Sequence, residues 1–267
     1  MTDLMPIKEI LATPTRSLIL RIPWLCAAAA FAAAQPIPAA ENQVTGDRLA
    51  TSDGDVIIHP VNHASLILTW KDKIIYVDPV GGGNRFGTLP KPALILLTDI
   101  HGDHLNLDTL AAVANDKTVL VAPAAVAEQL APALRKQTTV LTNGETRMVL
   151  GVSIEALPMY NTTPNRLQFH PKGRGNGYLL TLGGKRLYLS GDTEDIPEMK
   201  GLKNIDVAIV CMNLPYTMDV EQAAQAVRVF RPKVVYPYHS RGSDLEKFKK
   251  LVGDDLGIEV RLRNWYQ

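Results

Sequence analysis

Short apolar runs rich in β-branched residues recur along the chain from about residue 55, with turn residues between them. Runs of this kind are typical of strands, whereas longer stretches of alanine and leucine favour helices. In the first half the pattern predicts strands at 56–58, 64–70, 73–77 and 93–97, then helices at 105–114 and 122–134. In the second half it predicts strands at 139–142, 146–157, 178–182, 185–189, 207–211 and 234–238, with a helix at 220–230. The chain therefore follows a similar order of elements twice.

Four of these apolar runs end in a polar residue that is able to do chemistry. Buried strands of layered α/β proteins build sites by delivering such residues at their carboxyl ends. We therefore expect these residues to meet at one edge of the fold. They are Asp99 and His101 after 94–97, Asp192 after 188–191, Asn213 after 210–212 and His239 after 234–238.

Composition narrows the class of protein. The chain has 267 residues, of which 46% are hydrophobic, and this is enough apolar material for a substantial core rather than a disordered chain. It has a net charge of +1 and only 6% aromatic residues, which argues against nucleic acid as a partner. One continuous domain over residues 41–267 fits the usual size range. The pattern gives no indication of the oligomeric state.

The first forty residues differ from the rest. An apolar stretch at 22–34 follows Lys8, Arg16 and Arg21 and ends in small residues, as a secretory signal peptide does. It is shorter than the ~20 apolar residues of a membrane span, so we expect a cleaved signal at 1–40 and no stable span afterwards. A periplasmic or secreted protein is therefore predicted.

Removal of residues 1–40 would leave 25 basic and 25 acidic side chains, and Cys211 as the single cysteine. The exported protein would then be electrically neutral and unable to form an internal disulfide.

Candidate metal ligands gather after the strand at 93–97. Asp99, His101, Asp103 and His104 lie within six positions, and extended backbone would direct the first two to the same side. A turn at Gly102 would send the other two toward a second point. Imidazole with carboxylate is a ligand mixture suited to zinc, iron or manganese. The pattern therefore suggests two metal ions, although each residue taken alone also fits a surface loop, and Asp103 fits a helix cap.

At this point the chain resembles the metallo-β-lactamase-fold hydrolases, whose hallmark is His-x-His-x-Asp-His after a strand. The resemblance extends over most of residues 56–240 and is nearest to the branch with ascorbate-6-phosphate lactonase-like and N-acyl-phosphatidylethanolamine phospholipase D-like members. It rests on Asn62-His63-Ala64-Ser65, Tyr76-Val77-Asp78-Pro79, the ligand loop, Ser190-Gly191-Asp192-Thr193 and Tyr236-Pro237-Tyr238-His239. It implies an α/β fold, an αββα sandwich with a dinuclear site at one edge of its two sheets.

The resemblance also implies roles for individual residues. His101 would ligate the first metal and His104 the second, together with Asp103 and His239, while Asp192 would bridge both. His170 is the best candidate for the remaining ligand of the first metal, with a metal-free loop histidine as the alternative.

Asp99 departs from the family pattern, because a histidine usually stands there. An aspartate also binds zinc through oxygen, so Asp99 is predicted as a ligand, with a supporting role or a vacant first site as alternatives. We expect two Zn²⁺ ions, and Mn²⁺ or Fe²⁺ are alternatives that the added carboxylate favours.

These features predict an exported metal-dependent hydrolase that acts on a small molecule. Metal-bound hydroxide would cleave an ester, lactone, amide or phosphodiester. The resemblance implies Asp103 as the catalytic residue that orients the hydroxide and moves its proton, with Asp192 as the alternative. The alternative is a metal- or ligand-binding protein on a hydrolase-derived fold, without turnover.

Contacts to substrate are less well defined by the sequence, and no substrate-binding residue is assigned. Basic residues near the expected ligands mildly favour an anionic substrate, and a glycine-rich stretch at 173–177 is either a phosphate cradle or a simple turn. His63 is either a contact near the site or structural. The basic residues are Arg166, Lys172, Arg174 and Arg241, and the possible oxyanion donors are Tyr160, Asn161, Asn213 and Tyr216.

Overall fold

The computed structural model describes residues 44–266. The signal peptide expected at 1–40 lies outside the described residues. Within residues 44–266, no helix combines the length and the apolar character that crossing a bilayer requires.

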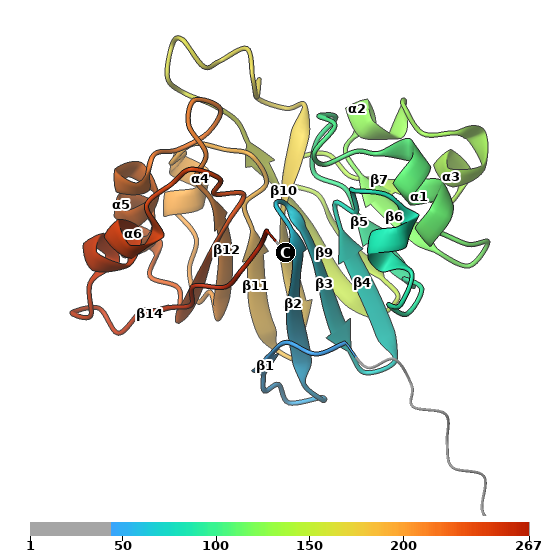
Figure 1. The fold of residues 1–267 in the computed structure, drawn as a ribbon, viewed down its shortest axis with the longest axis horizontal. Coiled ribbons are helices and arrows are strands. Elements are labelled where there is room, and N and C mark those ends of the chain that lie inside the picture. Colours follow the sequence, from blue (N-terminus) through green and yellow to red (C-terminus); the bar gives the residue numbers. More distant parts are fainter. Residues whose placement is uncertain (1–43, 267) are drawn as a thin grey trace, which may run out of the picture. The chain divides into compact units, whose positions relative to one another are not determined.

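Two seven-stranded sheets form the centre of the protein, and both follow the same plan (Figure 1). In each sheet the strands lie side by side in their order along the chain, the first four antiparallel and the last four parallel. The first sheet contains β1 (Asp47–Leu49), β2 (Val56–Asn62), β3 (Ser65–Trp70), β4 (Lys73–Val77), β5 (Leu94–Leu96), β6 (Val119–Ala122) and β7 (Thr138–Val140). The second contains β8 (Thr146–Val149), β9 (Val152–Met159), β10 (Gly175–Leu182), β11 (Lys185–Leu189), β12 (Val207–Cys211), β13 (Val234–Tyr238) and β14 (Glu259–Val260).

Helices cover the outer face of each sheet. The 3-10 helix η1 (Gly83–Phe86) and helices α1 (Leu107–Val113), α2 (Ala124–Ala127) and α3 (Pro132–Lys136) belong to the first half of the chain. Helices α4 (Pro197–Lys200), α5 (Val220–Phe230) and α6 (Leu245–Val252) belong to the second. Figure 1 shows these two groups on opposite sides of the paired sheets, so the predicted αββα sandwich is confirmed.

The strands are buried on both faces because each sheet packs against the other sheet on one face and against helices on the other. In β3, Leu66 and Leu68 join the large core cluster shared by the two sheets, whereas Ile67 joins the smaller cluster under α1. Side chains alternate along a strand, so a strand covered on both faces has to be apolar throughout. This explains the continuous apolar runs in the sequence.

Two sequence predictions of secondary structure are wrong in detail, and one helix has no counterpart among them. The helix expected at 122–134 is the end of β6 followed by two short helices, because Pro123 and Pro132 cannot occupy a helix interior. The strand expected at 146–157 is a hairpin of β8 and β9, whose turn has positive φ at Leu150 and Gly151. Helix α6, capped by Asp244, was not predicted.

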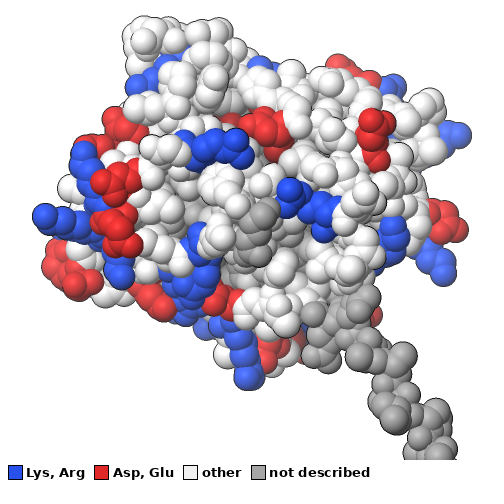
Figure 2. All heavy atoms as spheres, viewed as in Figure 1, with Lys and Arg blue, Asp and Glu red and all other residues white. Residues whose placement is uncertain are grey.

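The charged side chains are mixed over the surface. Figure 2 shows lysine and arginine interspersed with aspartate and glutamate on the face that Figure 1 presents, without a broad area of one sign. On this face, local groups rather than an overall field would attract a charged ligand.

Candidate metal centre

The ends of three strands place candidate ligands at one edge of the sandwich, as predicted. Asp99 follows β5, Asp192 follows β11, and His239 comes directly after β13. The turn after Asp99 closes with backbone bonds from His104 and Leu105 to the carbonyl of His101. Asp103 does not cap α1, because Asn106 does so by accepting a hydrogen bond from Thr109.

Three residues at this edge have a backbone conformation that non-glycine residues rarely adopt. His63, Asp78 and His239 have φ values of 52°, 42° and 46°. Such left-handed positions carry some strain and are common at functional sites, where the surrounding structure maintains them. Each ends or follows a strand and turns its side chain toward the same small volume.

Three histidines converge on the carboxylate of Asp192. Its Oδ2 lies 3.2 Å from Nε2 of His104, 3.2 Å from Nε2 of His170 and 3.5 Å from Nε2 of His239. All four residues are at least 97% buried. His104, Asp192 and His239 offer ligand atoms within 4.8 Å of one another, which is the spacing of a metal-binding group. The resemblance placed His104 and His239 at the second metal together with Asp103, and gave Asp192 as the bridge between the two metals. The structure brings His104, Asp192 and His239 together.

His104 is held from behind by Asp78. Nδ1 of His104 lies 2.8 Å from Oδ2 of Asp78, which also accepts a hydrogen bond from Oγ1 of Thr98 at 2.6 Å. A proton on Nδ1 leaves the lone pair of Nε2 directed at Asp192, as in the carboxylate–histidine–metal arrangement. Burial disfavours the charged imidazole, but Asp192 and Asp78 outweigh it and raise the pKa of His104 well above its ordinary value, so that metal binding at Nε2 would release a proton.

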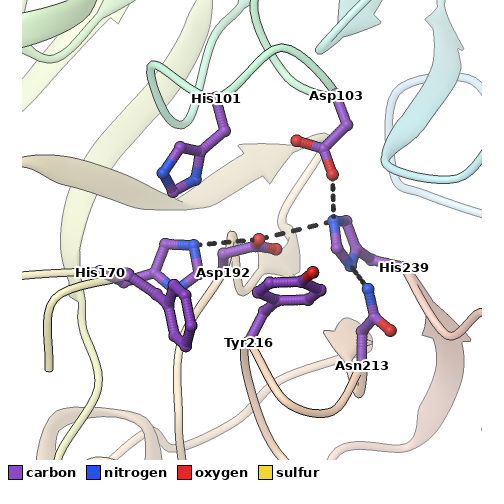
Figure 3. Close-up of a pocket in the computed structure, with 8 residues that line it drawn as sticks. His101, Asp103, His170, Asp192, Asn213, Tyr216 and His239 are labelled. Atoms are coloured by element: carbon purple, nitrogen blue, oxygen red, sulfur yellow. Dashed lines mark hydrogen bonds and ion pairs between the residues drawn. The ribbon is translucent and has the colours of Figure 1, made fainter. Parts of the chain in front are cut away.

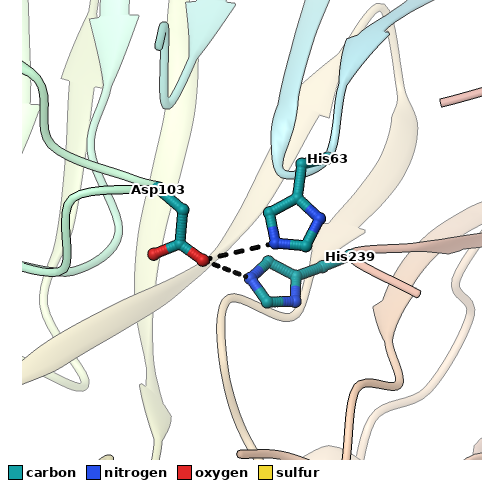
Figure 4. A group of neighbouring side chains, drawn as sticks. All are labelled: His63, Asp103 and His239. Carbon is teal, nitrogen blue, oxygen red and sulfur yellow. Dashed lines mark hydrogen bonds and ion pairs between the residues drawn. The ribbon is translucent and has the colours of Figure 1, made fainter. Parts of the chain in front are cut away.

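Asp103 lies beside His104 and His239, the two histidines with which the resemblance groups it at the second metal. Its Oδ2 lies 3.1 Å from Nε2 of His239 and 3.3 Å from Nε2 of His63, whereas its Oδ1 is 3.9 Å from Nε2 of His104 (Figure 4). Burial alone would raise the pKa of Asp103, but hydrogen bonds from His239 and His63 lower it well below its ordinary value. These contacts favour the ionised form of the Asp103 carboxylate.

His63 belongs to the site rather than to the core behind it. Its ring lies 3.8 Å from the ring of His239, and its Nδ1 is 2.9 Å from the hydroxyl of Tyr266. Tyr266 also accepts a hydrogen bond from the backbone of Ser240. The two histidines and Asp103 form a second group with metal-binding spacing.

Asp99, His101 and His170 form a third such group, but Asp99 is already paired. The guanidinium of Arg174 makes a bidentate ion pair with it, Nε to Oδ1 at 3.0 Å and Nη2 to Oδ2 at 2.8 Å. Nδ1 of His101 lies 2.9 Å from the same Oδ2. Burial raises the pKa of Asp99, but the bonds from His101 and Arg174 outweigh it and lower the pKa.

The loop that carries His170 is attached to the core through Glu194. Oε2 of this buried carboxylate accepts hydrogen bonds from the backbone N–H and the hydroxyl of both Thr162 and Thr163, at 2.7 to 2.9 Å. Its Oε1 lies 3.0 Å from Nη1 of Arg166. Glu194 follows Asp192 by two residues. One short segment therefore carries the candidate ligand Asp192 and also anchors the loop that carries His170.

A pocket of about 280 Å³ opens over these side chains (Figure 3). Figure 3 shows His101 and Asp103 on one side of it, with Tyr216 and Asn213 on the other. The side-chain nitrogen of Asn213 lies 3.5 Å from Nδ1 of His239, and the ring of Phe169 contacts the ring of Tyr216. The remaining lining residues are His170, Asp192 and His239.

Several sequence hypotheses about substrate contacts are not supported. The hydroxyl of Tyr160 bonds Glu198, and the amide of Asn161 is buried against two backbone carbonyls, so neither donor is free. The glycine-rich stretch is not a phosphate cradle, because Gly175 and Gly177 lie in β10, where a Cβ would meet backbone oxygens at 2.8 Å. These glycines allow close packing of backbones instead.

Asp78, Glu194 and Tyr266 are functional neighbours that sequence reasoning did not assign. A signal existed for Asp78, because it follows the apolar strand at 73–77 in the same way that Asp192 follows its strand. No local pattern marks Glu194 or Tyr266, whose partners are distant in the sequence.

Residues 74–240 match the family model described as the beta-lactamase superfamily domain. The chain belongs to the metallo-β-lactamase superfamily. A UPF0173 metal-dependent hydrolase from Pyrococcus abyssi is 31% identical over 216 residues, covering 75% of this chain and 93% of the relative. This superfamily member is thus an enzyme of the metal-dependent hydrolase class, as predicted.

Solved structures agree with this assignment. A candidate metal-dependent hydrolase from Parabacteroides distasonis superimposes with a TM-score of 0.77 and 42% identity, covering 84% of this chain and 100% of the other. CmlA, a diiron β-hydroxylase from Streptomyces venezuelae, shares the fold with a TM-score of 0.55 and 19% identity, covering 70% of this chain and 45% of that one. The fold alone therefore does not determine which metal a member binds.

The residues of this metallo-β-lactamase-fold enzyme fit a metal ion at Asp192. Nε2 of His104, both ring nitrogens of His170 and Oδ1 of Asp192 are buried and have no hydrogen-bond partner within residues 44–266. Buried polar atoms are normally paired, so this set of nitrogen and oxygen atoms is suited to a metal ion. The attraction of the histidines outweighs burial and lowers the pKa of Asp192 well below its ordinary value, which keeps the carboxylate ionised.

Proposed function

We propose that the protein hydrolyses a small anionic molecule, with an ester, lactone, amide or phosphodiester as the bond that is cleaved. The observation that carries this proposal is the convergence of three imidazoles on Asp192 at the floor of the pocket. Imidazole nitrogens with one carboxylate suit Zn²⁺, and they also suit Mn²⁺ or Fe²⁺.

His104, Asp192 and His239 would hold the ion, with His170 as the nearest additional donor. When bound, a divalent ion polarises the scissile group and lowers the pKa of water to near neutrality. Asp78 keeps the proton on Nδ1 of His104, which leaves Nε2 as the donor. The burial of these residues excludes bulk water from the ligand atoms, and this strengthens their electrostatic interactions.

Asp103 is the catalytic residue of the proposal. Nε2 of His63 and Nε2 of His239 lie 3.3 Å and 3.1 Å from its Oδ2, while Oδ1 has no hydrogen bond among the described residues. The side chain is 44% exposed toward solvent and borders the pocket. Oδ1 would accept a hydrogen bond from the attacking water and orient it. Asn213 and Tyr216 lie across the pocket, where their N–H and O–H groups would stabilise negative charge on the substrate.

Arg241 supports an anionic substrate. Of the four basic residues near the site, three have acidic partners, namely Glu194 for Arg166, Glu198 for Lys172 and Asp99 for Arg174. Arg241 has no ion-pair partner within residues 44–266 and lies over the ring of Tyr266 at 5.0 Å. It lines a hollow of about 510 Å³ that shares Asp103, Asn213 and Tyr216 with the catalytic pocket.

Export is part of the proposal. The apolar stretch at 22–34, preceded by basic residues, supports a periplasmic or secreted protein. A fusion of residues 1–40 to an enzyme that is active only after export would test this. Activity that persists when Leu25→Arg interrupts the apolar stretch would refute it.

The hydrolase proposal is tested with purified protein of measured metal content and a panel containing one ester, one lactone, one amide and one phosphodiester. The variants are His104→Ala and a matched control, His59→Ala, which lies outside the site and contacts Thr45. We expect turnover of at least one substrate by the parent and the control, and a loss of at least ~100-fold in His104→Ala. Equal activity of His104→Ala and the parent would overturn the proposal.

A further inference from the structure

Arg174 fills the position at which the first of two metal ions would lie. Its Nη2 is 2.8 Å from Oδ2 of Asp99, 3.3 Å from Nε2 of His101 and 2.5 Å from the carbonyl oxygen of Phe169. One nitrogen of the guanidinium therefore contacts two of the three side chains that would have to hold the ion. The remaining side chain, His170, is nearer to Asp192 at 3.2 Å than to Asp99 at 3.8 Å.

The pair between Arg174 and Asp99 is built to persist. Asp99 has no exposed side-chain surface, and the side chain of Arg174 is 18% exposed. Both oxygens of the carboxylate are engaged, which is the bidentate geometry that makes arginine–carboxylate pairs strong. Arginine does not lose its proton in proteins, so this positive charge is permanent. A divalent cation at Asp99 would have to displace a guanidinium and then lie next to it.

The other group of ligands has no such competitor. Within residues 44–266, neither lysine nor arginine pairs with Asp192, and Nε2 of His104 and Oδ1 of Asp192 have no hydrogen-bond partner. The two halves of the expected dinuclear site therefore differ. At Asp99 the guanidinium of Arg174 neutralises the charge, whereas at Asp192 the buried ligand atoms have no such partner among the described residues.

We propose that Arg174 replaces one metal ion, so that the protein holds a single catalytic ion at His104, Asp192 and His239. This explains why an aspartate stands at position 99. A histidine there could not form the two parallel bonds to the guanidinium, whereas a carboxylate matches its geometry. Asp99 and Arg174 are a matched pair, and the two-ion site that the sequence predicts becomes a one-ion site. The inference rests on the proposed hydrolase function, whose metal number it specifies.

The test measures metal per chain by mass spectrometry after loading with excess Zn²⁺ and gel filtration. We expect one ion in the parent and two in Arg174→Gln, because the freed Asp99, His101 and His170 can then bind metal. Arg174→Gln leaves the buried carboxylate of Asp99 without its cation, and this could prevent folding. The double variant Asp99→His/Arg174→Gln removes that carboxylate as well, so it remains informative if the single variant does not fold. The control is Lys172→Gln, a basic residue of the same loop that pairs with Glu198, and it should keep one ion.

Loading with Co²⁺ gives an independent readout, because a second ion adds its own visible absorption. Two ions in the parent would overturn the inference while leaving the hydrolase proposal intact. One ion in a folded double variant would also overturn it, since Arg174 would then not be the competitor. Hydrolysis that survives complete removal of metal would instead overturn the proposed function, and the number of ions bound on reloading would still decide the inference.

Discussion

Asp78 and His104 form a completely buried pair, with 2.8 Å between the carboxylate Oδ2 and the imidazole Nδ1. Asp78 also accepts hydrogen bonds from the backbone N–H and the hydroxyl of Thr98. One carboxylate thereby joins the end of β5 to the ligand loop. The orientation of His104 follows from this pair, because the imidazole cannot rotate without losing a buried bond.

Asp78→Asn should weaken metal binding by roughly 10- to 100-fold, since an outer partner of a metal-binding histidine typically contributes that much. The amide keeps the shape of the side chain, but its nitrogen cannot accept the Nδ1 proton. Competition against a chromophoric chelator measures the affinity. Asp206→Asn is the matched control, because it removes a buried carboxylate that pairs with Lys185 and Lys233 instead. Equal affinities in the two variants would contradict the role assigned to Asp78.

Glu194→Gln should destabilise the protein in a pH-dependent way. Burial raises the pKa of Glu194, but the bonds from Thr162 and Thr163 outweigh burial and lower the pKa. The carboxylate is therefore more acidic folded than unfolded, where its pKa is about 4.3. Its stabilisation is complete above that value and is lost as the pH falls through the folded pKa. We expect the free energy of unfolding to fall by about 2 kcal/mol at pH 7 and by less at pH 3.5.

Urea unfolding at the two pH values measures this difference. Glu145→Gln is a suitable control, because Glu145 also accepts a bond from a threonine N–H but has a side chain that is 39% exposed, so the loss of stability should be much smaller. A Glu194→Gln penalty that stays the same at pH 3.5 would show that the ionised carboxylate is not the source of the stabilisation.

Gly177→Ala should destabilise the edge that carries Asp192. A Cβ at Gly177 would lie 2.8 Å from the carbonyl oxygen of Ser190 and 3.0 Å from that of Leu189, and these backbone atoms cannot move independently of the strand. Overpacking of this kind costs about 1–3 kcal/mol. Gly102→Ala is the control, because a Cβ there meets no atom within 4 Å. Equal melting temperatures of the two variants would contradict the close approach of β10 and β11.

The order of apolar runs was sufficient to predict where Asp99, Asp192 and His239 would meet. Each follows a buried strand, and strands that lie side by side in chain order bring their carboxyl ends to one edge. This part of the site depends only on local pattern and on the layered fold, so the sequence could predict it.

The remaining geometry depends on contacts between distant residues. Arg174 is 75 residues from Asp99, and the loop that directs it there is fixed by Glu194 rather than by any pattern of its own. Asp99 is predicted as a ligand because an aspartate can bind zinc through oxygen, and no local pattern indicates that Arg174 pairs with it. His63 lies 40 residues from Asp103, and their contact depends on an unusual backbone conformation that the sequence did not indicate.

Arg241→Gln should change selectivity between substrates. Arg241 lines the hollow next to the catalytic pocket and has no acidic partner among the described residues, so its charge is available to a substrate anion. A charge-assisted hydrogen bond of this kind is worth about 1.5 kcal/mol, which corresponds to a roughly tenfold lower kcat/KM for a phosphodiester and little change for a neutral ester. The loss should appear in KM, because Arg241 does not border the metal ligands, and it should diminish as added salt screens the charge. Lys117→Gln, an exposed lysine before β6, should leave both substrates unaffected, and Arg241→Lys should restore part of the preference. An equal loss of kcat/KM on neutral and anionic substrates would mean that Arg241 acts through its packing on Tyr266 and not through its charge.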